Sequence, residues 1–428
     1  MAPWNQSAQS WISKASGIPY FLTSAGEPWA PIGQNDAITW PEFADLYKGR
    51  SMATTEAYLR MLAEHGVTCL RLMMEYSQTG YRYFERNNGS FNPFLVELWD
   101  TVFNLCRQYG LKVLLTPYDT FWMWNKWKKH PYNTSNGGPC GSRNQWLLCG
   151  DTRKRIKRRL DFATQRWGWD GTIFAWDLWN EIHPAHAGDS AESLFEFVED
   201  ISTHLRETEQ RLHGATHLQT VSVFLPVLGS NPQVGDVVFR HPCLDMVNIH
   251  LYESGTIDNP RNTVDAAVST GRLIANAVDQ APPDRPVFDS EHGPIHAFKD
   301  RHRTLSADFD DEYFRHIQWA HLASGGAGGG MRWPNRHPHS LTVGMRKAQR
   351  MMANFLPYLD WKHFARRTLT GKLEVSRPGV EAFGCSDGRQ ALLYLLRRDT
   401  LTAKGMLNGQ AEPVTVQVRL PGLQPGAY

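Results

Sequence analysis

Short apolar runs alternate with amphipathic segments along most of this chain. The apolar runs contain few charges, which is typical of strands buried on both faces. The amphipathic segments repeat their apolar positions every three or four residues, which is typical of helices with one buried face. Asn92-Pro93 and Gly110 frame one such segment, and Thr54 and Gly66 are expected to cap and end another. This pattern predicts a parallel sheet covered by helices.

Eight candidate strands follow one another in this alternation. Their predicted ranges are 31–35, 67–74, 112–117, 173–181, 218–225, 246–252, 286–291 and 330–333. Eight strands alternating with helices over roughly 300 residues favour the α/β class and a (β/α)8 TIM barrel over an open doubly wound sheet. The glycine-rich stretch 324–330 lacks the Lys-Ser/Thr of a phosphate loop and precedes a strand. We therefore expect close backbone approach there.

The pattern changes near Pro357. The runs 380–385 and 390–396 flank Ser386-Asp-Gly-Arg389, a strong hairpin signal, and 414–420 alternates like a half-exposed strand. We divide the chain into a catalytic barrel with an N-terminal extension, 1–356, and a small antiparallel, β-sandwich-like accessory domain, 357–428. A further strand is expected to begin at the chain end, which indicates truncation. Residues 1–29 are expected to form a lid or a strand across the barrel bottom.

Composition narrows the class of protein. The 428 residues have a formal net charge of +2, with 41% hydrophobic and 21% charged residues. That balance argues against nucleic acid and charged membranes as partners, and no apolar run approaches the roughly 18 residues of a membrane span. The N-terminus has neither the basic nor the apolar region of a leader. The sequence as it stands predicts a cytoplasmic protein, or a secreted or periplasmic one if a leader was removed.

Aromatic residues are abundant, with 16 Trp, 14 Tyr and 20 Phe. They are typical either of a bulky core or of flat platforms for sugar rings. The long segment 118–150, after the third strand, carries Tyr118, Trp122 and Trp124 among others. Because barrel active sites lie at the carboxyl ends of strands, we expect it to line a cleft, with a compact self-packed loop as the alternative. The basic run 153–159 has helical spacing and is expected to be a solvated helix face.

Metal and disulfide chemistry receive little support. Cys140 and Cys149 share one segment and leave a local disulfide open, but no C-x-x-C spacing is present. No H-x-H ends the first strand and no H-E-x-x-H occurs. We expect no metal and no cofactor, although three histidine pairs were considered: 183/186, 292/296 and 337/339.

Two strands end on glutamates. The run that begins at Ile173 stops at Asn180-Glu181, and the seventh strand stops at Glu291. In a closed barrel, the carboxyl ends of strands four and seven open into one mouth. Glycoside hydrolysis uses two such carboxyls: one protonates the leaving oxygen, and the other attacks the anomeric carbon or activates water. Arg71, inside an apolar strand, needs a charged partner.

These residues, in this order and on these strands, resemble clan A of the glycoside hydrolases, most closely family 5, the cellulase and β-mannanase family. The resemblance covers about residues 30–335. It implies that Glu181 is the general acid/base and Glu291 the nucleophile. It also implies that Asn180 holds the sugar 2-hydroxyl and that Arg71, a further candidate substrate-binding residue, lies close to Glu291. It further implies that Tyr252 donates a hydrogen bond to the nucleophile and that His250 lines the catalytic subsite. Trp333 is implied to be the floor on which the sugar stacks.

One position departs from the family pattern. Many members carry a histidine just after strand three, where this chain has Pro117-Tyr118-Asp119-Thr120. Tyr118 or Asp119 is expected to make that substrate contact instead. Asn35 at the end of the first strand is a further candidate contact, and His183 is either a cleft-wall residue or an ordinary loop histidine.

The sequence therefore predicts a retaining glycoside hydrolase that cleaves β-glycosidic bonds of a plant-type glycan or oligosaccharide, with mannan or glucan favoured through the family. Retention requires carboxyls about 5–5.5 Å apart, whereas a gap above roughly 6.5 Å indicates inversion. A transglycosylase of the same clan and a non-catalytic carbohydrate-binding barrel are the alternatives. The oligomeric state is left open.

Overall fold

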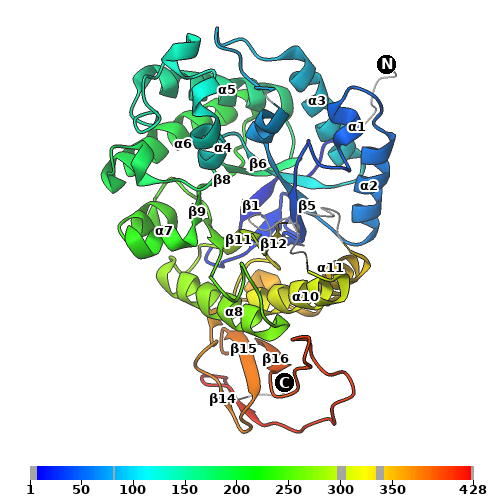
Figure 1. Cartoon of the computed structure of the whole chain (residues 1–428). Helices are drawn as coiled ribbons and strands as arrows, with labels where there is room; N and C mark the ends of the chain where they lie inside the picture. The colour runs from blue at the N-terminus through cyan, green and yellow to red at the C-terminus, as the bar shows by residue number, and fades with distance from the viewer. Residues whose placement is uncertain (1–6, 81, 296–304, 334–341, 426–428) are drawn as a thin grey trace.

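The computed structural model describes residues 7–80, 82–295, 305–333 and 342–425. At its centre, a ring of parallel strands is surrounded by helices (Figure 1). The strand order is β8-β7-β6-β5-β4-β12-β11-β10-β9, and β8 and β9 follow each other directly in the chain. They are the two halves of the fifth predicted strand, separated at Val221. The predicted (β/α)8 barrel is confirmed.

Each predicted barrel strand is present within a few residues of its expected range. The strands are β4 (Gly33–Asp36), β5 (Cys69–Met73), β6 (Lys112–Thr116), β7 (Ile173–Asp177), β8 (Leu218–Thr220), β9 (Ser222–Phe224), β10 (Val247–Leu251), β11 (Val287–His292) and β12 (Met331–Arg332). The helices of the barrel are α1 (Ala44–Tyr47), α2 (Ala53–Glu64), α3 (Pro93–Gln108), α4 (Thr120–Lys126), α5 (Gly150–Trp167), α6 (Ala191–His213), α7 (Leu225–Ser230), α8 (Thr263–Gln280), α10 (Ala307–Ala323) and α11 (Val343–Phe355). In the described ranges, no helix is both long and apolar enough to cross a bilayer.

Local signals placed some helix ends correctly and others not. The Asn92 side chain accepts a hydrogen bond from the Phe94 amide at 3.2 Å, so the predicted cap of α3 is confirmed. The predicted cap at Thr54 is wrong, because α2 begins at Ala53 and its N-cap position, Met52, makes no side-chain cap. Buried apolar positions such as Leu59, rather than a cap, hold this helix in place.

The N-terminal segment closes the amino end of the barrel. Strands β1 (Ile12–Lys14), β2 (Phe21–Thr23) and β3 (Pro28–Trp29) form a small antiparallel sheet. Ile12 and Phe21 pack in one buried cluster with Leu114 of β6 and Phe174 of β7. The expectation of strands across the barrel bottom is confirmed. This sheet does not cover the opposite end, where the carboxyl ends of the strands lie.

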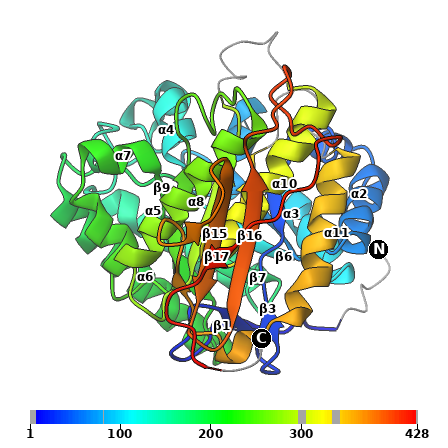
Figure 2. The ribbon, with the colours of Figure 1, turned by 90° about the horizontal axis from the view of Figure 1, so that it is seen from below.

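The C-terminal strands form a hairpin against the barrel. Strands β13 (Arg367–Thr368), β15 (Val380–Ser386) and β16 (Ala391–Arg397) make one sheet, and β14 (Glu374–Val375) pairs with β17 (Val418–Arg419). Figure 2 shows the hairpin lying across the helices α8 and α10. Phe383 and Leu392 share a buried cluster with Leu322 of α10. The predicted hairpin is confirmed, but of the predicted strand 414–420 only Val418–Arg419 forms a strand, β17, which pairs with β14.

The glycine-rich turn before β12 brings two backbones together. Gly328 has a φ of +113°, and a Cβ at this position would lie 2.4 Å from the Pro31 carbonyl oxygen. Only glycine fits such an approach, so the expected close packing at the last strand is confirmed.

Candidate active site

Two glutamates face each other at the carboxyl end of the barrel. Glu181 follows β7, and Glu291 is the second-last residue of β11. A carboxylate oxygen of each and a ring nitrogen of His250 all lie within 4.8 Å of one another. The shared mouth expected for strands four and seven is therefore present, and the short gap between the carboxyls is the geometry associated with retention.

Glu291 is the carboxylate with the stronger cationic partner. Arg71 Nη1 donates to Glu291 Oε2 at 2.7 Å, and the Tyr252 hydroxyl donates to Glu291 Oε1 at 2.8 Å. Burial raises the pKa of Glu291, while His250 and Arg71 lower it. Arg71 therefore favours the ionised form of Glu291, as a nucleophile requires.

Glu181 has a different environment. Burial raises its pKa to about 7, and Arg71, the main opposing charge, only partly offsets this. His250 Nδ1 lies 2.9 Å from Glu181 Oε1. Burial lowers the pKa of His250 to about 4, so the ring is neutral at pH 7. A neutral imidazole can donate to the ionised carboxylate or accept from the protonated acid, which suits a group that changes protonation state.

The backbone at Glu181 is in the left-handed region. Its φ is +51°, a conformation that costs a non-glycine residue roughly 1–2 kcal/mol. The Glu181 amide donates to Ser222 Oγ at 3.0 Å, and Ser222 in turn donates through that hydroxyl to Asp177 at 3.0 Å. The strained turn is thus held by β9 and aims the carboxyl into the mouth.

Arg71 is fully buried, and its hydrogen bonds are to other protein side chains. Nη2 donates to Asp177 at 2.8 Å and to the Asn180 side-chain oxygen, and Nη1 also donates to Asn35 Oδ1 at 3.0 Å. Asn35 is itself buried and donates to the Ser290 carbonyl at 2.8 Å. The resemblance placed Arg71 near Glu291 correctly. As direct substrate contacts, however, Arg71 and Asn35 are wrong, because neither reaches the surface of the mouth.

Asp119 contacts Asn180 rather than the mouth. It is 1% exposed, and its Oδ2 accepts from the Trp122 amide at 2.6 Å as the N-cap of α4. Its Oδ1 accepts a short hydrogen bond from Asn180 Nδ2. Burial raises the pKa of Asp119 to about 7, while the hydrogen bond from Asn180 lowers it. The expected direct substrate contact of Asp119 is wrong.

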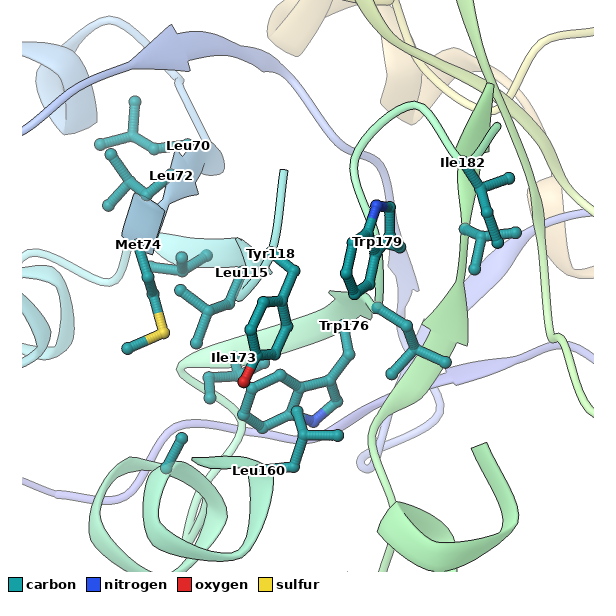
Figure 3. Packing of buried hydrophobic residues seen from close by; sticks show 14 of the residues in the cluster. Leu70, Leu72, Met74, Leu115, Tyr118, Leu160, Ile173, Trp176, Trp179 and Ile182 are labelled. Carbon is teal, nitrogen blue, oxygen red and sulfur yellow. The ribbon is translucent and has the colours of Figure 1, made fainter. Parts of the chain in front are cut away.

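Tyr118 is also wrong as a substrate contact, since it is fully buried. Its ring stacks on Trp179 with centroids 5.2 Å apart, as Figure 3 shows, and its hydroxyl lies 2.8 Å from that of Tyr132. The guanidinium carbon of Arg159 lies 4.1 Å from the centroid of the Tyr118 ring, and Arg159 forms an ion pair with the buried Glu75. The basic run 153–159 is thus a helix face as predicted, except that Arg159 points inward because Glu75 neutralises it.

The segment 118–150 was expected either to line a cleft or to pack on itself, and different parts of it do each. Tyr118, Tyr132 and Trp146 are buried, so this part is a self-packed loop. The Trp124 ring lies 4.9 Å from the His186 ring and 3.9 Å from the Arg143 guanidinium, and these contacts do not support its predicted place in the site.

Trp122 belongs to a row of aromatic rings that leads out of the site. Between ring centroids, Trp333 lies 5.2 Å from Trp40 and 5.8 Å from Tyr76, and Tyr76 lies 5.4 Å from Trp122. Phe121, 54% exposed, continues the row at 5.1 Å from Trp122. The row joins the end of β12 to the surface of α4 and offers stacking faces along its length.

Glu181, His250 and Glu291 are also the side chains that could hold a cation among the described residues. His183 is half-buried, and its Nδ1 accepts from the Ala185 amide at 3.1 Å, which fits the loop-histidine alternative. The considered partners His296, His337 and His339 lie outside the described residues. All six cysteines are free thiols, so the Cys140–Cys149 disulfide left open above is not formed here.

Several site residues were missed by sequence reasoning. Asp177 had a usable signal, because a carboxylate inside the apolar run of β7 needs a partner as much as Arg71 does. Ser222, Ser290, Trp40 and Tyr76 had none, since each is an ordinary residue until the barrel brings it to the mouth.

The chain was compared with known proteins. No protein-family model matches it. A mannan endo-1,4-β-mannosidase of Arabidopsis thaliana is 20% identical over 256 residues, covering 55% of this chain and 56% of the relative. The chain thus spans about half the length of the curated relative it matches.

Solved structures give a fuller match. A family 5 mannosidase from Rhizomucor miehei superposes with a TM-score of 0.58 at 15% identity, over 82% of this chain and 99% of that one. The fold is that of the family 5 glycoside hydrolases. An exo-β-1,4-mannosidase from an Opitutaceae bacterium gives a TM-score of 0.57 at 16% identity over 80% of this chain and 62% of that one. An endo-β-1,4-mannanase from Thermotoga petrophila gives 0.55 at 15% identity over 84% of each chain.

Proposed function

We propose that this protein is a retaining β-glycoside hydrolase that acts on a β-linked, mannose-containing glycan or oligosaccharide. The observation that carries the proposal is the pair of carboxyls within 4.8 Å, one held by Arg71 and the other by His250. The mannose preference is supported by the names of the similar proteins. Two of them are described in complex with mannosyl-fructose and with Manβ1-4GlcNAc.

The mechanism follows from the two environments. Glu291 attacks the anomeric carbon with a carboxylate oxygen and forms a glycosyl-enzyme ester, while Glu181 transfers its proton to the departing glycosidic oxygen. Glu181, now ionised, then takes a proton from water, and the resulting hydroxide attacks the anomeric carbon and releases Glu291. Tyr252 and Arg71 hold Glu291 in line throughout, and His250 supports both protonation states of Glu181.

The test uses Glu181→Ala and Glu291→Ala with aryl β-mannosides and β-glucosides. Both variants should lose at least about 10³-fold in kcat/KM on phenyl glycosides, because each removes a group that bonds in the transition state. Azide should restore turnover of a 2,4-dinitrophenyl glycoside by the Glu181 variant and give the β-azide. Near-full activity in the Glu291 variant, or an α-azide product, contradicts the proposal.

Treatment with a chelator distinguishes this mechanism from one that uses a metal ion bound by Glu181, His250 and Glu291. EDTA treatment should leave kcat/KM of the wild-type protein unchanged. Product analysis over time on mannan and mannooligosaccharides then distinguishes hydrolysis from sugar transfer, and release of single sugars from cleavage within the chain.

A further inference from the structure

The Asn180 side chain is held from both sides. Its oxygen accepts from Arg71 Nη2, and its Nδ2 donates to Asp119 Oδ1. An amide nitrogen carries two hydrogens, so one remains for another acceptor. Asn180 is 4% exposed and directly precedes Glu181, and among the described residues its Nδ2 has a recorded hydrogen bond to Asp119 alone.

Asp119 is built into this arrangement by the backbone as well. The Asn180 amide donates to the Tyr118 carbonyl at 2.9 Å, and the Thr120 amide donates to the Asn180 carbonyl at 3.2 Å. The two residues therefore face each other across the extensions of β6 and β7. Because Asp119 also caps α4, neither of its oxygens is free to turn toward the mouth.

We propose that Asp119 is a positioning residue that orients the Asn180 amide so that its second N–H donates to the 2-hydroxyl of the sugar at the cleavage point. This inference rests on the proposed function and names a residue that sets selectivity for that hydroxyl. Arg71 fixes the amide oxygen, and Asp119 fixes the nitrogen. Without Asp119 the amide loses the partner that sets the direction of its donor and turns more freely about its last bond.

One pair of substrates tests this role. Removing the 2-hydroxyl from a mannoside or a glucoside yields the same 2-deoxy sugar, so a single 2,4-dinitrophenyl 2-deoxy-β-glycoside serves as the control for either preference. Asp119→Ala should lower kcat/KM on the 2-hydroxy substrate by about 10- to 100-fold, the order of effect for an oriented donor. On the 2-deoxy substrate the loss should be at most about threefold, since the donor has no partner there.

Asp119→Ser is the matched variant. Serine is a good N-cap, so it keeps the start of α4, but its shorter side chain does not reach Asn180. It should show the same substrate-dependent loss as Asp119→Ala. Asn180→Ala should lose the same discrimination, and the double variant Asp119→Ala with Asn180→Ala should be no worse than Asn180→Ala alone.

Each outcome decides a separate point. Equal losses on both substrates, or full activity of the serine variant, overturn the positioning role and leave Asp119 as a helix cap. A wild-type protein that cleaves neither substrate contradicts the proposed function itself. Thermal melts of all variants show whether a loss comes from misfolding, which lowers both activities together.

Discussion

Arg71 donates to Glu291 at 2.7 Å through Nη1 and to Asp177 at 2.8 Å through Nη2, so one buried guanidinium joins β11, which carries the proposed nucleophile, to β7, which precedes the proposed acid. A planar guanidinium holds its donors at fixed, separated positions that fit two carboxylates in different directions, whereas an ammonium is a compact point charge on a flexible stem. The relative placement of Glu291 and Glu181 therefore depends on a third residue that does not face the substrate.

Arg71→Lys should lower kcat/KM by about 100-fold, because lysine keeps the charge but lacks the fixed fork that positions both carboxylates. The acidic limb of the pH profile should also move to higher pH, since the pKa of Glu291 rises when its cation is weakened. Steady-state kinetics across pH measure both effects.

Arg107→Lys is the control for the loss of a buried ion pair. Arg107 pairs with the buried Asp170 at 2.8 Å, away from the mouth. This variant should lower the melting temperature without moving either limb of the profile. A shift of the acidic limb in the control, or its absence in Arg71→Lys, contradicts the assignment.

The pH dependence of kcat/KM should be bell-shaped, with its basic limb near pH 7. Glu181 must be protonated to act as the acid, and its raised pKa of about 7 means that activity is lost as pH rises through that value. Glu291 must be ionised, so activity is lost on the acidic side as pH falls through its pKa, which burial raises above the usual value.

The leaving group provides an internal check on that basic limb. A 2,4-dinitrophenolate leaves without protonation, whereas a phenolate needs the acid. The basic limb should therefore be steep for phenyl glycosides and weak for 2,4-dinitrophenyl glycosides, and Glu181→Gln should remove it. Equal basic limbs for both substrates indicate that another group titrates.

Ser222→Ala should lower kcat/KM by about tenfold, because it removes the hydroxyl that holds the left-handed Glu181 amide. The cost in unfolding free energy should be about 1 kcal/mol, the usual value for one hydrogen bond. Thr220→Ala, which removes a buried hydroxyl bonded to the Met246 carbonyl at 3.0 Å, should cost similar stability and leave kcat/KM unchanged. Equal kinetic losses in both variants exclude a specific role for Ser222.

Trp122→Ala should raise KM for mannotetraose by about tenfold and leave an aryl monoglycoside nearly unaffected. The ring row from Trp333 through Tyr76 to Trp122 places this indole away from the carboxyls, where a second sugar would stack. Leu148→Ala, which truncates an exposed apolar side chain of the same segment, is the control and should change neither KM. A loss confined to the monoglycoside contradicts this placement.

The sequence by itself determined the barrel and the two glutamates. Apolar runs and amphipathic segments alternate regularly because every parallel strand is buried on both faces and every covering helix on one, and that periodicity is local. Glu181 and Glu291 were visible because each ends such a run. The buried Arg71 could be assigned a charged partner for the same reason, since an unpaired cation in a core is too costly.

Only the tertiary structure decided which polar residues face the substrate and which support those that do. Tyr118, Asp119 and Asn35 have the right types at the right strand ends, but packing turns them inward, onto Trp179, Asn180 and Arg71. Ser222, Trp40 and Tyr76 join the site from segments far apart in the chain. Side-chain direction at a strand end depends on contacts between neighbouring strands, which no local pattern encodes, whereas the alternation that builds the strands is written in the sequence.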